Sequence, residues 1–297
     1  MCRPRLSSVL SGLFACLFNL GLLAAPVSDS RGVQLLSAHV PQRIISLAPH
    51  LTEMLYTIGA GGQIVGTLAY SDFPAAAKAI PRVGDAFRID MERLLALRPD
   101  LVLAWQSGNS AADIAQLERL GIPVYVAAAP QLAGIADLLV DLGRLTGHQA
   151  AADRAAAVYR TGLLRLRQRY QGARPLTVFF EIWNRPLMTV NGQHIISDAI
   201  HSCGGRNPFA ALQPLAPTVS LEAVLLANPQ LIVATSSGGN QGVLLSFWQR
   251  WDSLDAVRHQ QIYTIPAELI TRPSTRILQG LEMLCSLFER GRAAVPH

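Results

Sequence analysis

The feature that most constrains the fold is a stretch of sequence that occurs twice. Residues Met91–Ala104 (MERLLALRPDLVLA) align without a gap on Leu221–Ala234 (LEAVLLANPQLIVA), 130 residues later in the chain. Both copies carry a glutamate at their second position, a proline at their ninth and an apolar run after the proline. A helix, a turn and a buried strand account for this pattern, and its recurrence predicts two α/β lobes related by internal duplication. One continuous doubly wound sheet is the alternative, but it would not explain why the pattern restarts.

Short apolar runs alternate with helical patterns on both sides of the repeat. We expect strands at 43–47, 64–67, 101–105, 123–127, 176–181, 231–234 and 262–265, and helices at 51–58, 90–97, 111–120, 195–202 and 221–227. Strands that alternate with helices through short glycine and proline turns indicate parallel sheets with helices on their faces. The predicted fold class is therefore α/β, with two Rossmann-like lobes and a ligand cleft between them.

The middle of the chain predicts one long helix. Residues 147–172 contain no proline and are rich in Ala, Leu, Arg and Gln. A helix of about 24 residues would be about 36 Å long, enough to join the two lobes. We therefore expect a signal peptide at 1–25, a linker at 26–40, an N-terminal lobe at 41–147, a connecting helix at 148–172 and a C-terminal lobe at 173–297. A single helical connector makes a large hinge closure less expected than flexible linking strands would.

The first residues have the pattern of an export signal. Two arginines lie within Met1–Arg5, an uncharged stretch follows over Leu6–Ser28, and it includes the small residues Ala24 and Ala25. This order is typical of a secretory signal peptide and predicts a periplasmic location. An uncleaved membrane anchor and a lipid anchor at Cys16 are the alternatives.

Two cysteines, Cys203 and Cys285, remain after removal of that segment. An even pair in an exported chain predicts one disulfide bond, with two buried free thiols as the alternative. Neither cysteine has a second ligand at metal-binding spacing, so we expect no metal site there.

Charge and motifs argue against several classes of function. The formal net charge is +5, and the basic residues (all arginines except Lys78) are scattered rather than gathered in a stripe, which gives no support to nucleic-acid binding. The common nucleotide-binding, metalloprotease and serine-hydrolase motifs are absent. His194 and His201 are seven residues apart, but packing or exposure explains them better than a metal. We therefore expect no enzyme, no catalytic residue, no metal and no cofactor.

Aromatic and charged residues gather where the predicted strands end. They are Tyr70, Phe87, Trp105, Trp183, Glu268 and Arg272. Ligands of open α/β sheets bind beyond the carboxyl ends of the strands, and aromatic rings there offer flat apolar area to a large planar ligand. The alternative, in particular for Trp105 and Trp183, is that the rings seal the core of each lobe.

Four segments carry a resemblance to a known family. They are Tyr70–Pro74 (YSDFP), Glu92–Trp105 (ERLLALRPDLVLAW), Cys203–Asn207 (CGGRN) and Arg272–Arg276 (RPSTR). In this order they resemble the periplasmic cobalamin-binding proteins of ABC importers, within the helical-backbone class of substrate-binding proteins, over residues 41–287. The resemblance implies two lobes, a rigid connecting helix and a corrinoid in the cleft. It also implies a monomer when free.

The resemblance assigns roles to individual residues. Tyr70 matches a corrinoid contact, and Cys203 and Cys285 match a family disulfide. The segment Glu268, Leu269, Ile270, Thr271 and Arg272 matches a ligand-binding loop. With Phe87, Trp105 and Trp183, these residues form the expected ligand site.

The chain also departs from the family pattern. Ala86 and Ala216 stand where the family's best-known member has tryptophans that pack on the corrin, and Glu268 stands where it has an aspartate. The ligand could therefore be seated differently, and haem or a ferric siderophore is the alternative ligand.

Glu92 and Glu222 occupy matching positions in the two copies of the repeat. A carboxylate in a first helical turn stabilises the helix by about 0.3–1 kcal/mol, which is sufficient to explain either residue alone. The resemblance implies a second role, since in the family this pair docks into arginines of the two permease subunits. One acid per lobe would suit a two-fold symmetric membrane partner.

Overall fold

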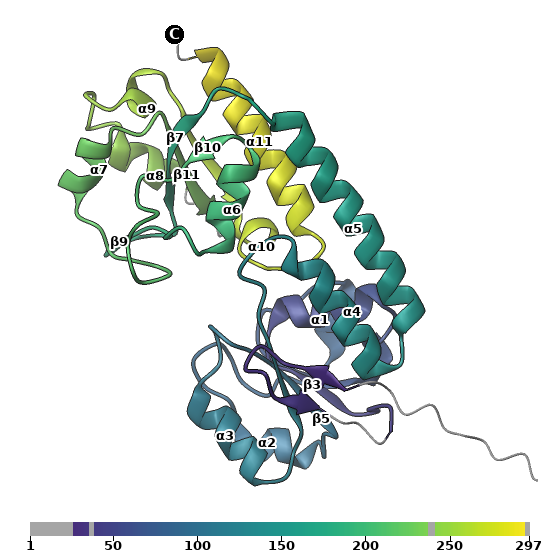
Figure 1. Ribbon diagram of the computed structural model, residues 1–297. Helices are drawn as coiled ribbons and strands as arrows, with labels where there is room; N and C mark the ends of the chain where they lie inside the picture. The colour runs from purple at the N-terminus through teal and green to yellow at the C-terminus, as the bar shows by residue number, and fades with distance from the viewer. Residues whose placement is uncertain (1–25, 36–38, 237–240, 295–297) are drawn as a thin grey trace, which may run out of the picture.

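The protein consists of two lobes with a long helix along one side (Figure 1). The computed structural model describes residues 26–35, 39–236 and 241–294. The predicted signal peptide and Cys16 lie outside the described residues. No helix in the described part of the chain is both long enough and apolar enough to cross a membrane.

The N-terminal lobe is built on a four-stranded parallel sheet. Its strands are β3 (Ile44–Ser46), β4 (Ile64–Thr67), β5 (Leu101–Trp105) and β6 (Val124–Ala127), in the order β4-β3-β5-β6. Its helices are α1 (Pro49–Thr57), α2 (Met91–Ala96), α3 (Ala111–Arg119) and α4 (Gly134–Thr146), with the short 3-10 turns η1 (Gly61–Gln63) and η2 (Ala75–Ala79). The small antiparallel pair β1 (Val27–Ser28) and β2 (Gln34–Leu35) precedes it.

The C-terminal lobe repeats this topology. Its sheet contains β7 (Leu176–Glu181), β10 (Gly205–Arg206), β11 (Leu231–Ser236) and β12 (Ile262–Pro266), in the parallel order β10-β7-β11-β12. Its helices are α6 (Ile195–Ser202), α7 (Leu221–Ala227), α8 (Gln241–Trp248), α9 (Asp255–Arg258), α10 (Ala267–Ile270) and α11 (Ile277–Ala294). The hairpin of β8 (Trp183–Asn184) and β9 (Leu187–Met188) is inserted after β7.

The two sheets have the same strand order. Numbered along the chain within each lobe, the strands lie side by side in the order second, first, third, fourth. The repeated sequence forms α2 and β5 in one lobe and α7 and β11 in the other. The α/β class and the two-lobed duplication are therefore confirmed.

The helix α5 (Gln149–Tyr170) joins the lobes. Its 22 residues give a length of about 33 Å. Six side chains at spacings of three and four residues form its buried stripe: Ala152, Ala156, Tyr159, Leu163, Leu166 and Tyr170. This periodicity places them on one face of the helix, which packs against α4, α6 and α11.

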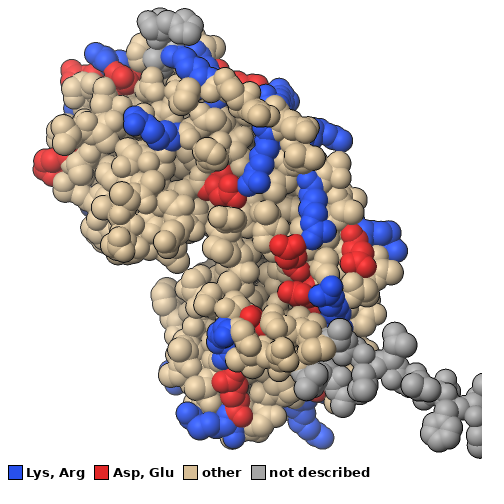
Figure 2. All heavy atoms as spheres, in the orientation of Figure 1, with Lys and Arg blue, Asp and Glu red and all other residues tan. Residues whose placement is uncertain are grey.

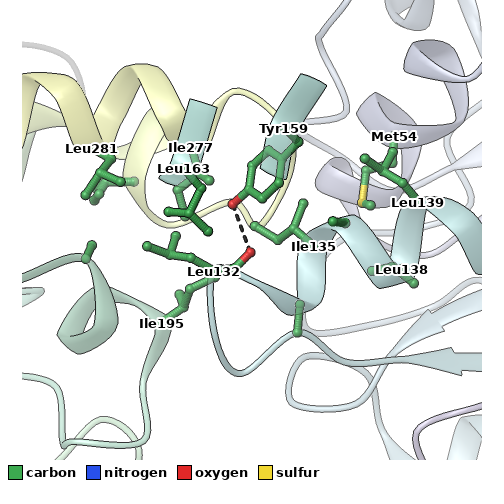
Figure 3. Close-up of a cluster of buried hydrophobic side chains, with 14 of the residues drawn as sticks. Met54, Leu132, Ile135, Leu138, Leu139, Tyr159, Leu163, Ile195, Ile277 and Leu281 are labelled. Atoms are coloured by element: carbon green, nitrogen blue, oxygen red, sulfur yellow. Dashed lines mark hydrogen bonds between the residues drawn. The ribbon is translucent and has the colours of Figure 1, made fainter. Parts of the chain in front are cut away.

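One hydrophobic core continues from lobe to lobe under this face of α5. Figure 3 shows Met54 and Leu139 of the N-terminal lobe in the same cluster as Ile195 and Ile277 of the C-terminal lobe. In their midst the Tyr159 hydroxyl donates a 2.9 Å hydrogen bond to the carbonyl of Leu132. The lobes are thus packed together by a shared core beneath the cleft, in addition to the covalent connection through α5.

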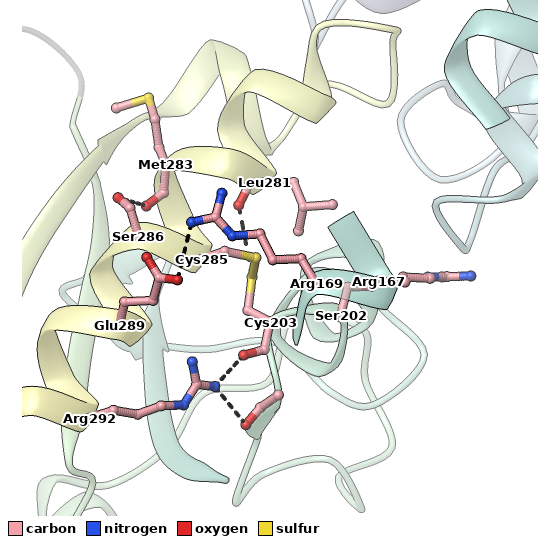
Figure 4. The surroundings of a disulfide bond; sticks show 11 residues. Arg167, Arg169, Ser202, Cys203, Leu281, Met283, Cys285, Ser286, Glu289 and Arg292 are labelled. Atoms are coloured by element: carbon pink, nitrogen blue, oxygen red, sulfur yellow. Dashed lines mark hydrogen bonds and ion pairs between the residues drawn. A yellow bond between two sulfur atoms is a disulfide. The ribbon is translucent and has the colours of Figure 1, made fainter. Parts of the chain in front are cut away.

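A disulfide bond joins α6 to α11 within the C-terminal lobe (Figure 4). Cys203 and Cys285 are both fully buried, with their Cα atoms 4.9 Å apart. The Arg292 guanidinium donates to the carbonyl of Cys203 from two turns further along α11. The predicted disulfide pairing is confirmed.

Candidate ligand-binding site

A cavity of about 330 Å³ lies between the lobes. Figure 2 shows the notch that separates the two lobes on the side away from α5. The N-terminal lobe contributes residues 47–50, 68–70, Ala86, Trp105 and 107–109, and the C-terminal lobe contributes His194, Ile195 and 271–273. Both lobes therefore contact whatever occupies this cavity.

The first turns of two helices, one from each lobe, form part of the cavity wall. Pro49 and His50 begin α1, and His194 and Ile195 begin α6. The His50 ring is nearly buried and meets Trp105 edge to face, with ring centroids 4.3 Å apart. Burial, together with the positive charge of Arg272, lowers the pKa of His50 to about 3, so its imidazole is neutral at physiological pH. Its Nε2 atom has no hydrogen-bond partner among the described residues.

His194 caps α6 with its side chain. Its Nδ1 accepts a 3.1 Å hydrogen bond from the backbone N–H of Ile196. Burial lowers the pKa of His194 as well, so the ring is neutral and its Nε2 carries the proton. His194 is therefore suited to donate a hydrogen bond to an acceptor in the cavity.

Loops that follow β4 and β5 shape the wall of the N-terminal lobe. Tyr70 has φ of 64°, in the left-handed region that is costly for a bulky residue, and its side chain is 75% exposed. Asn109 fixes the backbone at Trp105: its Oδ1 accepts from the backbone N–H of Trp105 at 2.6 Å, and its Nδ2 donates to the carbonyl of Leu47 at 3.0 Å. The wall thus presents an exposed phenol at Tyr70 and an indole at Trp105 that packs against the His50 ring.

Arg272 crosses from the C-terminal lobe to this wall. Its Nη1 lies 3.0 Å from Glu53 Oε1 and 3.0 Å from Asp72 Oδ1. Its Nη2 donates to the carbonyl of Tyr70 at 3.0 Å. The hydrogen bond and the charge of Arg272 hold the pKa of the Asp72 carboxyl below its usual value, although burial opposes this. Arg272 therefore donates three hydrogen bonds to acceptors of the opposite lobe.

The structure brings together some of the predicted ligand residues. Tyr70, Trp105, Thr271 and Arg272 line the cavity. Phe87, Trp183 and Glu268 are exposed but lie outside its lining, and Leu269 is half-buried. Ile270 is fully buried in the core, so its side chain faces no ligand.

Sequence reasoning missed several lining residues. His50, Asn109 and Ile195 belong to the cavity, and His194 was interpreted as packing or exposed. Their position in the sequence could have identified two of them, because His50 and Asn109 each lie just after a predicted strand, where ligands of such sheets bind. Of the two alanines that replace family tryptophans, only Ala86 lines the cavity.

Glu92 and Glu222 lie on the outer helices of the two lobes, α2 and α7 (Figure 1). Both side chains are exposed in a first helical turn. Asp90 caps α2 by accepting from the Arg93 N–H at 2.9 Å, and Ser220 caps α7 by accepting from the Ala223 N–H at 3.2 Å. Hydrogen bonds from its own backbone N–H and from Ser220 lower the pKa of Glu222. Each lobe thus presents one exposed carboxyl side chain at an equivalent place.

No three His, Cys, Asp or Glu side chains come together as a metal-binding group within the described ranges.

The sequence matches a family of binding proteins over most of its length. The family model for periplasmic binding proteins covers residues 44–269. The chain belongs to this family. Periplasmic binding proteins are transport components, which confirms the prediction that the chain is not an enzyme.

Relatives of this periplasmic binding protein have more specific descriptions. It is 33% identical over 253 residues to a vitamin B12-binding protein of Vibrio campbellii, a match that covers 84% of this chain and 90% of the relative. The solved structure of the periplasmic vitamin B12-binding protein BtuF of Vibrio cholerae superposes with a TM-score of 0.79 at 32% identity, covering 85% of this chain and 98% of that one. The family resemblance inferred from the four motifs is thereby confirmed.

The same fold also serves other ligands. The periplasmic haem-binding protein RhuT of a Roseiflexus species superposes with a TM-score of 0.76 at 22% identity, covering 84% of this chain and 99% of that one. Identity at this level shows the shared fold alone.

Proposed function

We propose that this protein captures cobalamin in the periplasm and delivers it to the permease of an ABC importer. The observation that carries the proposal is a cavity lined by both lobes, in a chain about one third identical to vitamin B12-binding proteins over most of its length. Tyr70 and Trp105 offer ring faces to the corrin, and Thr271 and Arg272 offer polar contacts from the other lobe. The corrinoid is cargo, and no other cofactor is part of the proposal.

The proposed ligand extends beyond the cavity. A corrinoid with its side chains exceeds about 330 Å³, so part of it would lie outside the lined space. Phe87 and Trp183 are 98% and 61% exposed, and they are the aromatic residues that we assign to the outer part of the ligand, with Glu268 and Leu269. Ala86, which lines the cavity, leaves room where a larger side chain would contact the ring.

Calorimetric titration of the purified protein tests the ligand. We expect one cyanocobalamin per chain, with cobinamide also bound and haem bound more weakly. A ferric siderophore is titrated in the same series. Tighter binding of haem or of the siderophore than of cyanocobalamin would overturn the assignment in favour of that ligand.

We propose further that Glu92 and Glu222 each contact an arginine of one permease subunit. Their equivalent, exposed positions in the duplicated lobes support this role. Changing either to arginine, in Glu92→Arg or Glu222→Arg, is expected to stop cobalamin uptake and leave cyanocobalamin affinity unchanged. Glu282→Arg on α11, also exposed, is the matched control and should leave both unchanged. A loss of affinity in the free protein would contradict the docking role.

The leader and the domain division belong to the same proposal. We propose that residues 1–25 are removed on export, that 26–40 form a linker before the N-terminal lobe at 41–147, and that 148–172 connect it to a C-terminal lobe at 173–297. Intact mass of the exported protein distinguishes cleavage near Ala25 from a lipid anchor at Cys16. Light scattering is expected to give a monomer in the absence of the permease.

A further inference from the structure

Near the cavity each lobe places, on the helix that begins at the cavity wall, a carboxylate that is bonded by groups outside that lobe. In the N-terminal lobe it is Glu53 on α1, which is only 3% exposed. In the C-terminal lobe it is Asp198 on α6, which is half-buried. Both residues follow, by one helical turn or less, the residues of α1 and α6 that line the cavity.

The two carboxylates are equivalent in the duplication. Residues 52–59 (TEMLYTIG) align on residues 197–204 (SDAIHSCG) at an offset of 145, so Glu53 matches Asp198. The aligned segments end at Gly59 and Gly204, which both adopt the left-handed backbone, with φ of 87° and 73°. The same place in each lobe therefore carries the acid that meets the other lobe.

Glu53 accepts hydrogen bonds from three side chains of the C-terminal lobe. Ser274 Oγ donates to Oε2 at 2.6 Å, while Arg272 Nη1 and Arg276 Nη1 lie 3.0 and 3.2 Å from Oε1. The Arg276 guanidinium also stacks on the Phe73 ring of the N-terminal lobe, 4.0 Å from its centroid. A buried carboxylate with this many partners fixes the geometry of the groups around it.

The contacts of Glu53 continue to the cavity wall. Arg272, held by Glu53, donates in turn to Asp72 and to the carbonyl of Tyr70. Tyr70 is the residue in a strained left-handed conformation whose side chain is presented to the cleft. A strained conformation persists only where its surroundings enforce it, and here the enforcing group comes from the opposite lobe.

Asp198 makes the reciprocal connection. Its Oδ2 accepts from the Leu132 N–H of the N-terminal lobe at 2.8 Å, and its Oδ1 is 2.8 Å from Arg167 Nη2 on α5. These bonds fix the start of α6, where His194 and Ile195 line the cavity, relative to the N-terminal lobe and the connecting helix.

We propose that Glu53 and Asp198 are positioning residues for ligand binding. They contact no ligand and act by setting the separation of the two cavity walls and, through Arg272, the orientation of Tyr70. This inference rests on the proposed function for its binding readout, and it assigns Arg272 a positioning role in addition to any ligand contact.

Affinity for cyanocobalamin tests the proposal. Because removing one partner of a buried ion pair leaves the other uncompensated, Glu53→Gln is expected to weaken binding about tenfold or more. Asp198→Asn, whose partners are more exposed, is expected to weaken it about threefold. Ser274→Ala, which removes one hydrogen bond and keeps every charge, is a milder variant in case Glu53→Gln does not fold, and it should also weaken binding.

Asp29→Asn is the matched control. Asp29 is buried, is paired with Arg31 and accepts from the Val126 N–H, but all its partners lie on the N-terminal side of the cleft. This variant is expected to lose stability and to keep wild-type affinity. Equal losses of affinity in Asp29→Asn and Glu53→Gln would mean that general destabilisation is the cause, and would overturn the proposal.

A double-mutant cycle separates positioning from a general effect. Because part of the effect of Glu53 passes through Tyr70, Glu53→Gln is expected to weaken affinity by a smaller factor in a Tyr70→Ala background than in the wild type. Effects that add in the double variant would contradict the proposed connection.

Hydrogen exchange gives a readout that does not depend on the ligand. The peptide 68–74 is expected to exchange faster in Glu53→Gln than in the wild type, and at an unchanged rate in Asp29→Asn. Failure of the wild type to bind cyanocobalamin would refute the proposed function alone, and exchange of this peptide would still decide the positioning role. Unchanged exchange in Glu53→Gln would overturn it.

Discussion

The two lobes share a strand order, but each is stabilised internally by different contacts. In the C-terminal lobe the end of α6 is tied to α11 by the disulfide at Cys203. The aligned residue of the N-terminal lobe is Ile58, which is fully buried in an apolar core. The C-terminal lobe also carries the β8–β9 hairpin, which has no counterpart between β3 and α1. Duplication thus accounts for the common topology, whereas the equivalent place in each lobe is stabilised differently, by a disulfide bond in one lobe and by apolar packing in the other.

The difference extends to the buried ionisable groups. The N-terminal lobe buries His50 as a neutral imidazole, and the C-terminal lobe buries Glu181 at the end of β7. Burial raises the pKa of Glu181 to about 7, although the 2.7 Å hydrogen bond from Trp248 Nε1 opposes the shift. The N-terminal lobe therefore buries a weakened base, His50, and the C-terminal lobe buries a weakened acid, Glu181, and also contains the weakened base His194.

Removing the disulfide is expected to give the largest effect on stability. The double variant Cys203→Ala/Cys285→Ala opens a link between residues 82 positions apart, which should lower the free energy of unfolding by about 2–5 kcal/mol. Ile58→Val at the equivalent N-terminal place should cost about 0.5–1.5 kcal/mol. Urea denaturation measures both. Equal losses would show that the cysteine pair gives no advantage over the apolar contact.

A smaller effect is expected in the dependence of stability on pH, with opposite signs for Glu181 and His50. The pKa of Glu181 is raised from 4.5 to about 7, so the folded state binds more protons than the unfolded state in this range. Its contribution therefore stabilises the protein below pH 4.5 and is lost as pH rises toward 7, by at most about 1.4 kcal/mol per pH unit. The pKa of His50 is lowered to about 3, so its contribution is present above pH 6.5 and is lost as pH falls.

Urea midpoints at pH 5 and pH 7.5 measure these contributions. Relative to wild type, Glu181→Gln should gain stability from pH 5 to pH 7.5, because it keeps an acceptor for Trp248 without titrating. His50→Leu should lose relative stability over the same interval. Parallel pH profiles for wild type and both variants would contradict the assignment of these two groups.

The smallest expected effect concerns the helix ends in the repeat itself. Arg98 and Asn228 occupy matching positions after α2 and α7, and both have positive φ, 44° and 38°. Asparagine tolerates this conformation better than arginine, so Arg98→Asn should raise the free energy of unfolding by about 0.5–1 kcal/mol. Thermal unfolding of Arg98→Asn measures this gain in stability, and the reverse substitution Asn228→Arg in the other lobe should lower stability. Opposite shifts of the melting temperature in the two variants would show that this helix end is better stabilised in the C-terminal lobe, and shifts of the same sign would contradict it.

Local patterns predicted most strands of the two sheets closely, but they missed β10 and the helices α4, α8, α9, α10 and α11. The strands Ile64–Thr67, Leu101–Trp105 and Leu176–Glu181 were predicted with the bounds that the structure has, as were the helices α6 and α7. These segments have strong apolar periodicity and end at clear glycine or proline turns. The helix α4 was not predicted, because Gly134 and Gly143 weaken its helical pattern, yet Gly143 is where α4 approaches Ala152 of α5 closely.

The site was only partly predictable, for a different reason. Tyr70 and Trp105 follow strands, so the strand-end rule found them. The bonds of Arg272 to Glu53 and to Asp72 join residues 219 and 200 positions apart, and no local pattern contains them. His50 was missed because a single histidine carries no spacing, and its role depends on the Trp105 ring packed against it.

The core that runs under α5 has a consequence for the protein as a folding unit. Its side chains come from both halves of the chain, so a fragment that ends before α5 would leave the inner face of α4 in water, and a fragment that begins after it would do the same to α11. Each half has one buried cluster of its own, but neither can cover its share of the core under α5. Excised halves would therefore associate or remain unfolded, and the whole chain would melt in one cooperative step. The two lobes look separable from the outside, but they form one thermodynamic domain.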